Sequence, residues 1–179
     1  MTYISDIKKD IPTAQITDLE QRTFETLKKL GIEFERVEND PVSSMEECIE
    51  ISNKLGAEIR KTIFLTNSKK NVFFLVVMPA EKSFKTKNFC ERIGCSRVSF
   101  ASEQYMKDIL GVLPGSASVM SLLNDVGSTV KVVFDKEIVN CEWFACNPGA
   151  NTSHIKIKTK DLINLFIPFT KHKATVIDL

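Results

Sequence analysis

Residues 59–78 read Ile-Arg-Lys-Thr-Ile-Phe-Leu-Thr-Asn-Ser-Lys-Lys-Asn-Val-Phe-Phe-Leu-Val-Val-Met, and this stretch decides the fold class. It holds two apolar runs, 59–66 and 72–78, on either side of the polar segment 67–71. Short runs rich in Ile, Val and Phe are typical of strands, and a polar connection of this length is typical of a hairpin loop. The stretch therefore predicts a β-hairpin.

Outward from this hairpin, apolar periodicity and end signals predict the remaining elements. Asp18 is the expected cap of a helix that Gly31 ends, and Ser43 and Ser44 begin possible capping boxes for a helix that Gly56 ends. Segment 111–118 predicts irregular structure, and Lys136-Glu137 predicts a hairpin turn. Further helices are expected at 85–93, 102–110 and 159–166, and further strands at 32–37, 97–100, 129–135, 155–157 and 174–179. This mixture indicates one α+β or mixed α/β domain.

Composition excludes several classes of protein. The chain has 179 residues, of which 43% are hydrophobic and 26% charged, so a disordered, collagen-like or coiled-coil chain is excluded. The longest apolar run, 72–78, is far shorter than the ~20 residues of a membrane span. The first residues lack the pattern of a secretory signal. We therefore expect a cytoplasmic protein without a membrane partner.

Charge is distributed unevenly along the chain. Residues 1–59 hold 7 Lys and Arg against 13 Asp and Glu, whereas residues 60–179 hold 17 against 10. A basic portion beside an acidic one is compatible with a side that faces a polyanion. Charge alone leaves open the alternative that the solvated helix surfaces merely differ.

The five cysteines form two pairs with four residues between the partners, Cys90 with Cys95 and Cys141 with Cys146, besides Cys48. Structural zinc sites use four ligands and usually tighter spacing, and neither histidine adjoins a pair. We interpret the cysteines as core residues and predict no metal site. A zinc or redox protein stays a distant alternative.

Lys61 is unusual because strand alternation places it on the same face as Ile59, Ile63 and Leu65. Such a cation either extends to the surface at a strand end or points into a cleft that binds an anion. The two histidines, His154 and His172, have no acid partner at this level, so each is interpreted as a surface or half-buried side chain.

An ordered series of motifs makes the chain resemble a known family. The series comprises Arg60-Lys-Thr-Ile-Phe-Leu-Thr66, Phe73-Phe-Leu-Val-Val-Met-Pro79, Ser96-Arg-Val-Ser-Phe-Ala-Ser102, Leu110-Gly-Val-Leu-Pro-Gly-Ser-Ala-Ser118, Leu122-Leu-Asn-Asp125, Asn147-Pro-x-x-Asn-Thr152 and Val176-Ile-Asp-Leu179. It resembles the YbaK/ProX family of aminoacyl-tRNA deacylases, related to the editing domain of prolyl-tRNA synthetase, and most of all the free-standing ProX/PrdX branch. The likeness covers residues 18–179, within a single editing domain expected over 1–179.

The resemblance implies an α/β fold with a mixed, largely antiparallel sheet curved around a pocket and helices packed outside. It implies hydrolysis of the ester of mischarged tRNA, foremost Ala-tRNA(Pro), in the service of translation fidelity and without a cofactor or metal. The implied partners are tRNA, at the acceptor end of proline tRNA, and prolyl-tRNA synthetase, but not DNA. The implied residues are, for catalysis, Lys61, Gly115 and Ser116 and, for substrate binding, Thr62, Gly111, Pro114, Ala117, Asn147 and Asn151.

Two departures from the family pattern concern specificity. Most free-standing alanine-specific members have His before the proline of the late motif, where this chain has Asn147. The residue after the lysine is often Asn in that branch, and here it is Thr62. These departures leave open a deacylase for Cys or Ser, or a module that binds tRNA or an amino acid without hydrolysis.

Overall fold

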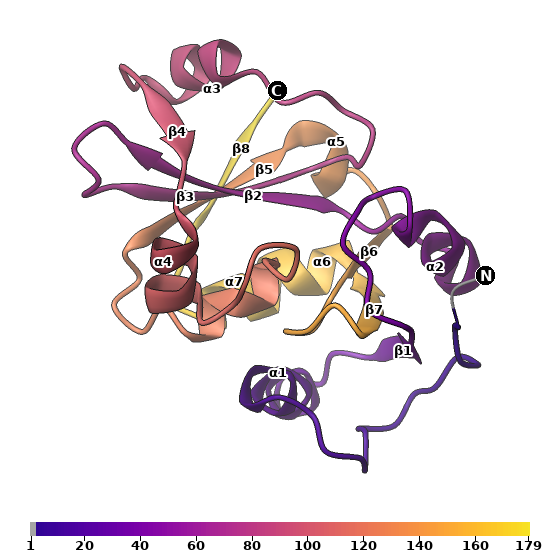
Figure 1. Cartoon of the computed structure of the whole chain (residues 1–179). Helices are drawn as coiled ribbons and strands as arrows, with labels where there is room; N and C mark the ends of the chain where they lie inside the picture. The colour runs from indigo at the N-terminus through magenta and orange to yellow at the C-terminus, as the bar shows by residue number, and fades with distance from the viewer. Residues whose placement is uncertain (1–2) are drawn as a thin grey trace.

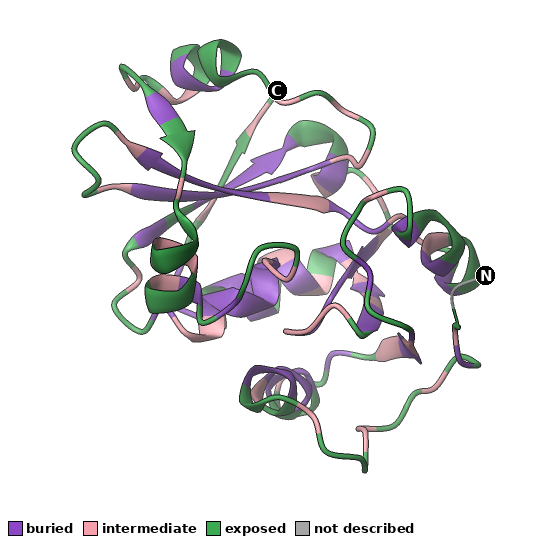
Figure 2. Cartoon of the chain, in the orientation of Figure 1, coloured by how far each residue is buried: buried purple, intermediate pink, exposed green. Residues whose placement is uncertain are grey.

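A computed structural model describes residues 3–179, and its centre is the predicted hairpin (Figure 1). Strands β2 (Lys61–Asn67) and β3 (Phe73–Met78) pair antiparallel, from Lys61 opposite Met78 to Thr66 opposite Phe73. Every residue of β3 is buried, which explains why its sequence is continuously apolar (Figure 2). The hairpin prediction is confirmed.

The hairpin belongs to a mixed five-stranded sheet. The strand order is β4-β2-β3-β5-β8, with β4 (Val98–Phe100) antiparallel to β2. Strands β5 (Val130–Asp135) and β8 (Ala174–Ile177) add parallel pairs on the other side. The sheet therefore combines the hairpin with crossover connections, as a mixed α/β fold requires.

A second sheet of three antiparallel strands adjoins the first. Its order is β1 (Phe34–Glu38), β7 (Ser153–Lys158) and β6 (Trp143–Cys146). Residues just before β2 join the sheets, because Ile59 forms a bridge with Ala145 and the Arg60 N–H donates to the Ala145 carbonyl at 2.9 Å. The predicted α/β class is confirmed, although its strands divide into two sheets.

Helix α1 (Asp18–Lys29) shows how local sequence fixes an element's end. Thr17, rather than the predicted Asp18, is the N-cap. Its hydroxyl accepts from the Glu20 N–H at 3.2 Å, while the Glu20 carboxylate accepts from the Thr17 N–H at 3.0 Å. This reciprocal capping box satisfies two N–H groups that would otherwise lack partners.

Helical segments lie in each of the regions where the sequence predicted a helix. The helical segments besides α1 are α2 (Cys48–Leu55), α3 (Thr86–Ile93), α4 (Glu103–Tyr105), η1 (Met106–Leu110), η2 (Val119–Leu123), α5 (Lys136–Val139), α6 (Thr159–Asp161), η3 (Leu162–Phe166) and α7 (Ile167–Phe169). The hairpin turn predicted at Lys136-Glu137 is wrong. The Asp135 carboxylate accepts from the Glu137 N–H at 2.8 Å and so begins the short helix α5 instead.

Three apolar clusters hold the layers together. The largest unites both sheets with α1 and the α6–α7 run, a second lies between the five-stranded sheet and α3, and the third lies between the three-stranded sheet and α2 (Figure 1). Within residues 3–179, no helix is both long and apolar enough to cross a bilayer. The junction of the two sheets is where the candidate site lies.

Candidate active site

A cavity of about 270 Å³ opens at the junction of the two sheets. We call it the glycine-loop cavity. It brings together five of the residues that the sequence analysis singled out: Thr62, Pro114, Gly115, Ala117 and Asn147. The other lining residues are Val42, Ser43, Ser44, Met45, Cys48, Ile59, Arg60, Ile63, Phe64, Phe100, Ala101, Met106 and His154.

The loop between η1 and η2 forms one wall of this cavity. Gly115 has φ of +87°, and a Cβ built on it would meet no atom within 4 Å, so its backbone faces open space. The Ser116 N–H donates to the Leu113 carbonyl at 3.0 Å. Within residues 3–179, the N–H groups of Gly115 and Ala117 donate to no protein acceptor. These two groups, rather than that of Ser116, are free to bind a ligand oxygen.

Gly111 supports the loop from outside the cavity. It ends η1 with φ of +65°, and a Cβ there would overlap the side chain of Asn124. That side chain donates to the Leu110 carbonyl at 2.7 Å and so ties the start of the loop to the residues after η2. Gly111 therefore shapes the loop, and a side chain at this position would displace its anchor.

Unpartnered polar atoms concentrate in this cavity. Across residues 3–179, three buried side-chain polar atoms have no hydrogen-bond partner: Arg60 Nε, Thr62 Oγ1 and Thr159 Oγ1. The first two belong to adjacent lining residues at the start of β2. Folded proteins satisfy nearly all buried polar groups, so two adjacent orphans behind the wall of one cavity make this wall unusual in the described part of the chain.

The late motif supplies a second wall. Asn147 lines the cavity, and its side-chain oxygen accepts from the Gly149 N–H at 3.1 Å. Asn151 does not line the cavity, but its amide donates to the Val42 carbonyl at 2.8 Å. Asn151 therefore holds the loop of residues 42–45 in place as a wall of the cavity.

Lys61 lies outside the cavity lining. Strand alternation turns it to the same face as Ile63 and Leu65, which pack in the cluster under α3, and its ammonium donates to the Lys82 carbonyl at 2.7 Å. Ile63 and Leu65 share the expected face, whereas Ile59 packs in the cluster under α2. The Lys61 side chain is half-buried with a protein acceptor and does not line this cavity. The catalytic roles implied for Lys61 and Ser116 stay predictions.

His154 is the lining residue that sequence reasoning undervalued. It is 2% exposed on β7, and its Nδ1 lies 2.9 Å from the Asn39 side-chain oxygen. Burial lowers the pKa of His154 to about 4, so the ring is neutral near pH 7. The sequence offered one signal that His154 lies near the site, namely its position three residues after Asn151 of the late motif. Its hydrogen-bond partner Asn39 is 115 positions away in the chain, so the sequence did not reveal that contact.

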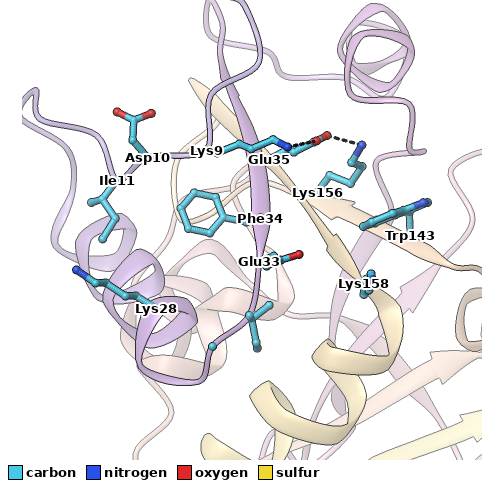
Figure 3. A pocket seen from close by; sticks show the side chains of 12 residues that line it. Lys9, Asp10, Ile11, Lys28, Glu33, Phe34, Glu35, Trp143, Lys156 and Lys158 are labelled. Carbon is cyan, nitrogen blue, oxygen red and sulfur yellow. Dashed lines mark ion pairs between the residues drawn. The ribbon is translucent and has the colours of Figure 1, made fainter.

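A larger groove of about 710 Å³, the lysine groove, lies on the three-stranded sheet (Figure 3). Its lining residues are Lys9, Asp10, Ile11, Lys28, Gly31, Ile32, Glu33, Phe34, Glu35, Trp143, Lys156 and Lys158. Glu35 pairs with Lys156 at 2.5 Å and with Lys9 at 3.4 Å. Lys156 and Lys158 also lie 5.0 and 5.9 Å from the Trp143 ring centroid.

Candidate metal ligands do not gather in the described part of the chain. No group of three His, Cys, Asp or Glu within residues 3–179 could hold a metal ion. The five cysteines are free, and Cys48, Cys90 and Cys146 are buried. Cys146 packs in the largest apolar cluster, and this burial raises the pKa of its thiol.

Comparison with known proteins first defines the class. A solved structure described as a candidate trans-editing enzyme for prolyl tRNA synthetase shares the fold, with a TM-score of 0.68 at 16% identity, over 92% of this chain and 98% of that one. The family model "Aminoacyl-tRNA editing domain" matches residues 39–165, which include every residue of the glycine-loop cavity. The chain belongs to the aminoacyl-tRNA editing domain family, and the resemblance found in its sequence is confirmed.

Two individual proteins are similar to this chain over most of its length. The chain is 32% identical to the prolyl-tRNA editing protein ProX of Acetoanaerobium sticklandii over 145 residues, which are 81% of this chain and 88% of that protein. It is 26% identical to prolyl-tRNA synthetase associated domain-containing protein 1 of Danio rerio over 162 residues, which are 89% and 87% of the two chains. The likeness therefore extends beyond the matched domain to most of the chain.

Proposed function

We propose that this protein is a trans-editing aminoacyl-tRNA deacylase that acts in the cytoplasm on mischarged tRNA, with Ala-tRNA(Pro) as the preferred substrate. The single observation that carries the proposal is the glycine-loop cavity, whose lining includes Thr62 together with Gly115 and Ala117, two residues whose backbone N–H groups have no protein acceptor within residues 3–179. Family membership and the ProX likeness support the reaction and the choice of tRNA.

The volume of the cavity agrees with a small acyl group. Drug-sized ligands occupy pockets of about 300–1,000 Å³, so a cavity of about 270 Å³ suits an aminoacyl group with part of the terminal ribose. Phe64, Phe100 and Met106 supply apolar wall around it. A small side chain such as that of alanine fits this setting better than a large one.

The chemistry requires little from side chains because an aminoacyl ester is already activated. A water oxygen bonds to the carbonyl carbon, the bond from that carbon to the ribose oxygen breaks, and the ribose oxygen takes up a proton. Negative charge develops on the carbonyl oxygen, and backbone N–H groups aimed at it stabilise that charge in a partly dry site. In this proposal the donors are those of Gly115 and Ala117, and no metal takes part.

Recognition of the tRNA would come from charge outside the cavity. Residues 60–179 carry an excess of seven positive charges, which favours a polyanion and predicts salt-dependent binding. In this proposal Lys61, adjacent in the chain to the cavity-lining residues Arg60 and Thr62, holds the terminal nucleotide or its phosphate as a point charge. Prolyl-tRNA synthetase is the proposed source of the mischarged substrate.

A second candidate function is a module that binds aminoacyl-tRNA without hydrolysing it. The observation that favours it is Asn147, an amide that cannot transfer a proton near neutral pH, at a position where most related alanine-specific proteins have His. An amide can still orient the substrate by hydrogen bonding, so we prefer the deacylase.

Single-turnover deacylation of Ala-, Cys- and Ser-charged tRNA(Pro), measured with EDTA present, separates the two functions. The deacylase predicts release of alanine faster than in buffer, with Cys and Ser esters hydrolysed more slowly. Tight binding of all three tRNAs without release would support the binding module. Hydrolysis that disappears with EDTA and returns with an added metal ion would contradict the metal-free mechanism.

A further inference from the structure

The side chain of His154 has one fixed tautomer, and this follows from its only hydrogen-bond partner within residues 3–179. Nδ1 lies 2.9 Å from Asn39 Oδ1. The Asn39 amide nitrogen already donates to two carbonyls, those of Asp40 at 2.8 Å and Asn151 at 3.0 Å. The atom that faces His154 is therefore the amide oxygen, which can only accept, so Nδ1 must carry the proton.

The fixed tautomer leaves Nε2 of His154 as an acceptor. In a neutral imidazole with a proton on Nδ1, the other nitrogen presents a lone pair. Nε2 has no protein partner within residues 3–179, yet it is not among the buried polar atoms sealed away without one. Because His154 lines the glycine-loop cavity, this lone pair is available to a ligand there.

The cavity needs such an acceptor if the proposed function holds. An aminoacyl ester carries an α-ammonium group, which must keep hydrogen-bond acceptors when it leaves water. The cavity lining contains no Asp or Glu, and its charged side chain, Arg60, is a cation paired with Glu58. One of the two lone pairs of the Asn147 oxygen is already engaged with the Gly149 N–H. A neutral imidazole can accept from the ammonium without adding a repelling charge.

We propose that Nε2 of His154 accepts a hydrogen bond from the α-ammonium group of the aminoacyl ester, and that Asn39 is the positioning residue that holds the ring in this tautomer. The inference rests on the proposed function for its ligand. It gives the cavity a means to distinguish an aminoacyl ester from an acyl ester without the amino group. It also gives a role to a histidine that lies outside the family's late motif.

The test compares two esters that differ only in the amino group, Ala-tRNA(Pro) and propionyl-tRNA(Pro), in single-turnover deacylation. A hydrogen bond to a charged group contributes about 1.5–3 kcal/mol, so His154→Leu should slow the alanyl ester about 10- to 100-fold and the propionyl ester less than about 3-fold. His154→Gln keeps an acceptor near the Nε2 position and should retain most of the preference. Equal slowing of both esters by His154→Leu would overturn the proposal.

Failure of the proposed function is distinguishable from failure of this inference. If the wild-type protein hydrolyses neither ester, binding of 3′-alanylamino-3′-deoxyadenosine and its propionyl counterpart decides. A preference for the alanyl compound that His154→Leu removes supports the inference, and equal affinities overturn it.

The tautomer has its own spectroscopic signature, which remains informative if His154→Leu does not fold. Nitrogen-15 shifts of wild-type His154 should show a protonated Nδ1 and an unprotonated Nε2, and the Nε2 signal should move when the alanyl compound binds. Asn39→Leu should abolish the single tautomer, whereas Asn39→Asp, which keeps an oxygen acceptor, should preserve it. A protonated Nε2 in the free wild-type protein would overturn the proposal.

Discussion

The glycine-loop cavity and the lysine groove differ in what their polar groups already bind. The groove is larger and more highly charged, but Lys9 and Lys156 both pair with Glu35 (Figure 3), and Lys156 and Lys158 lie 5.0 and 5.9 Å from the Trp143 ring centroid. The cavity is smaller and holds an orphan hydroxyl and two free backbone N–H groups. The two regions therefore differ in the partners that their polar groups lack rather than only in size or charge, and our proposal takes this deficit of partners as the mark of the ligand site.

The largest expected effect comes from the glycine loop. Gly115→Ala places a Cβ at φ of +87° beside the proposed oxyanion donors, and we expect a loss of deacylation of about 100-fold or more. Gly94→Ala is the matched control, because Gly94 has φ of +74° and equally open surroundings at the end of α3. Each variant should lose about 1–2 kcal/mol of stability, since both force a Cβ into the left-handed region.

Activity and thermal unfolding of both variants are measured side by side. The glycine-loop cavity is the site if only Gly115→Ala loses activity. Equal activities for the two variants would remove the loop from the mechanism.

Substitution of Lys61 tests whether its ammonium, which lies outside the cavity lining, acts in tRNA binding or in the chemical step. Because its ammonium lies outside the lining and donates to the Lys82 carbonyl, we expect Lys61→Ala to weaken tRNA binding rather than the chemical step. The expected loss in kcat/KM is about 10-fold, the scale of one charge-assisted contact, with most of it in KM. A loss confined to kcat at saturating tRNA would place the ammonium at the reacting ester instead.

Removal of the unpartnered Thr62 hydroxyl should have a smaller effect on deacylation, and a second unpartnered hydroxyl elsewhere in the chain provides a matched control. Thr62→Val removes a buried group without a partner, so stability should stay level or rise, while activity should fall about 3- to 10-fold, as for one neutral hydrogen bond. Thr159→Val removes the corresponding orphan hydroxyl away from the cavity and should leave activity unchanged. If both variants keep full activity, the Thr62 hydroxyl does not contact the substrate.

We expect the smallest effect from a substitution in the lysine groove, at Glu35. Hydrogen bonding to Lys156 is the main cause that holds the pKa of Glu35 below its ordinary value. A carboxyl with a lowered folded-state pKa stabilises the protein above its unfolded-state pKa and loses that contribution as pH falls through the folded value.

Glu35→Gln should therefore cost less than about 1 kcal/mol at pH 7 and nothing at pH 3, because the pair is partly solvated. Deacylation should change less than about 2-fold, the scale of a surface ion pair. Denaturant unfolding at both pH values and the deacylation assay check this. A large loss of activity would mean that the groove, not only the cavity, takes part.

Much of the fold was predictable because it is encoded locally. The hairpin of β2 and β3 follows from apolar runs around a polar loop, and Gly56 and Gly94 end helices where expected. The division into two sheets was not predictable, since it depends on contacts of Ile59 and Arg60 with Ala145, more than 80 positions away. The short helix α5 was missed because a single Asp135 cap replaced the expected turn.

The candidate site was predictable only in part, because some of its contacts join residues that are distant in the chain. Motif residues Thr62, Gly115 and Asn147 do meet in one cavity. His154 was missed because its neutral, oriented state depends on burial and on Asn39, neither of which its own neighbours in the sequence reveal. The position of Lys61 relative to the cavity likewise required the sheet and α3.

The most direct test of the central claim is where an uncleavable substrate fragment binds. Backbone amide shifts recorded by NMR during titration with 3′-alanylamino-3′-deoxyadenosine report on both regions at once, and Trp143, the single tryptophan, marks the lysine groove. Our account predicts shift changes at Thr62, Gly115 and Ala117, with the Trp143 indole signal unmoved. Changes at Trp143 with none along the glycine loop would contradict it.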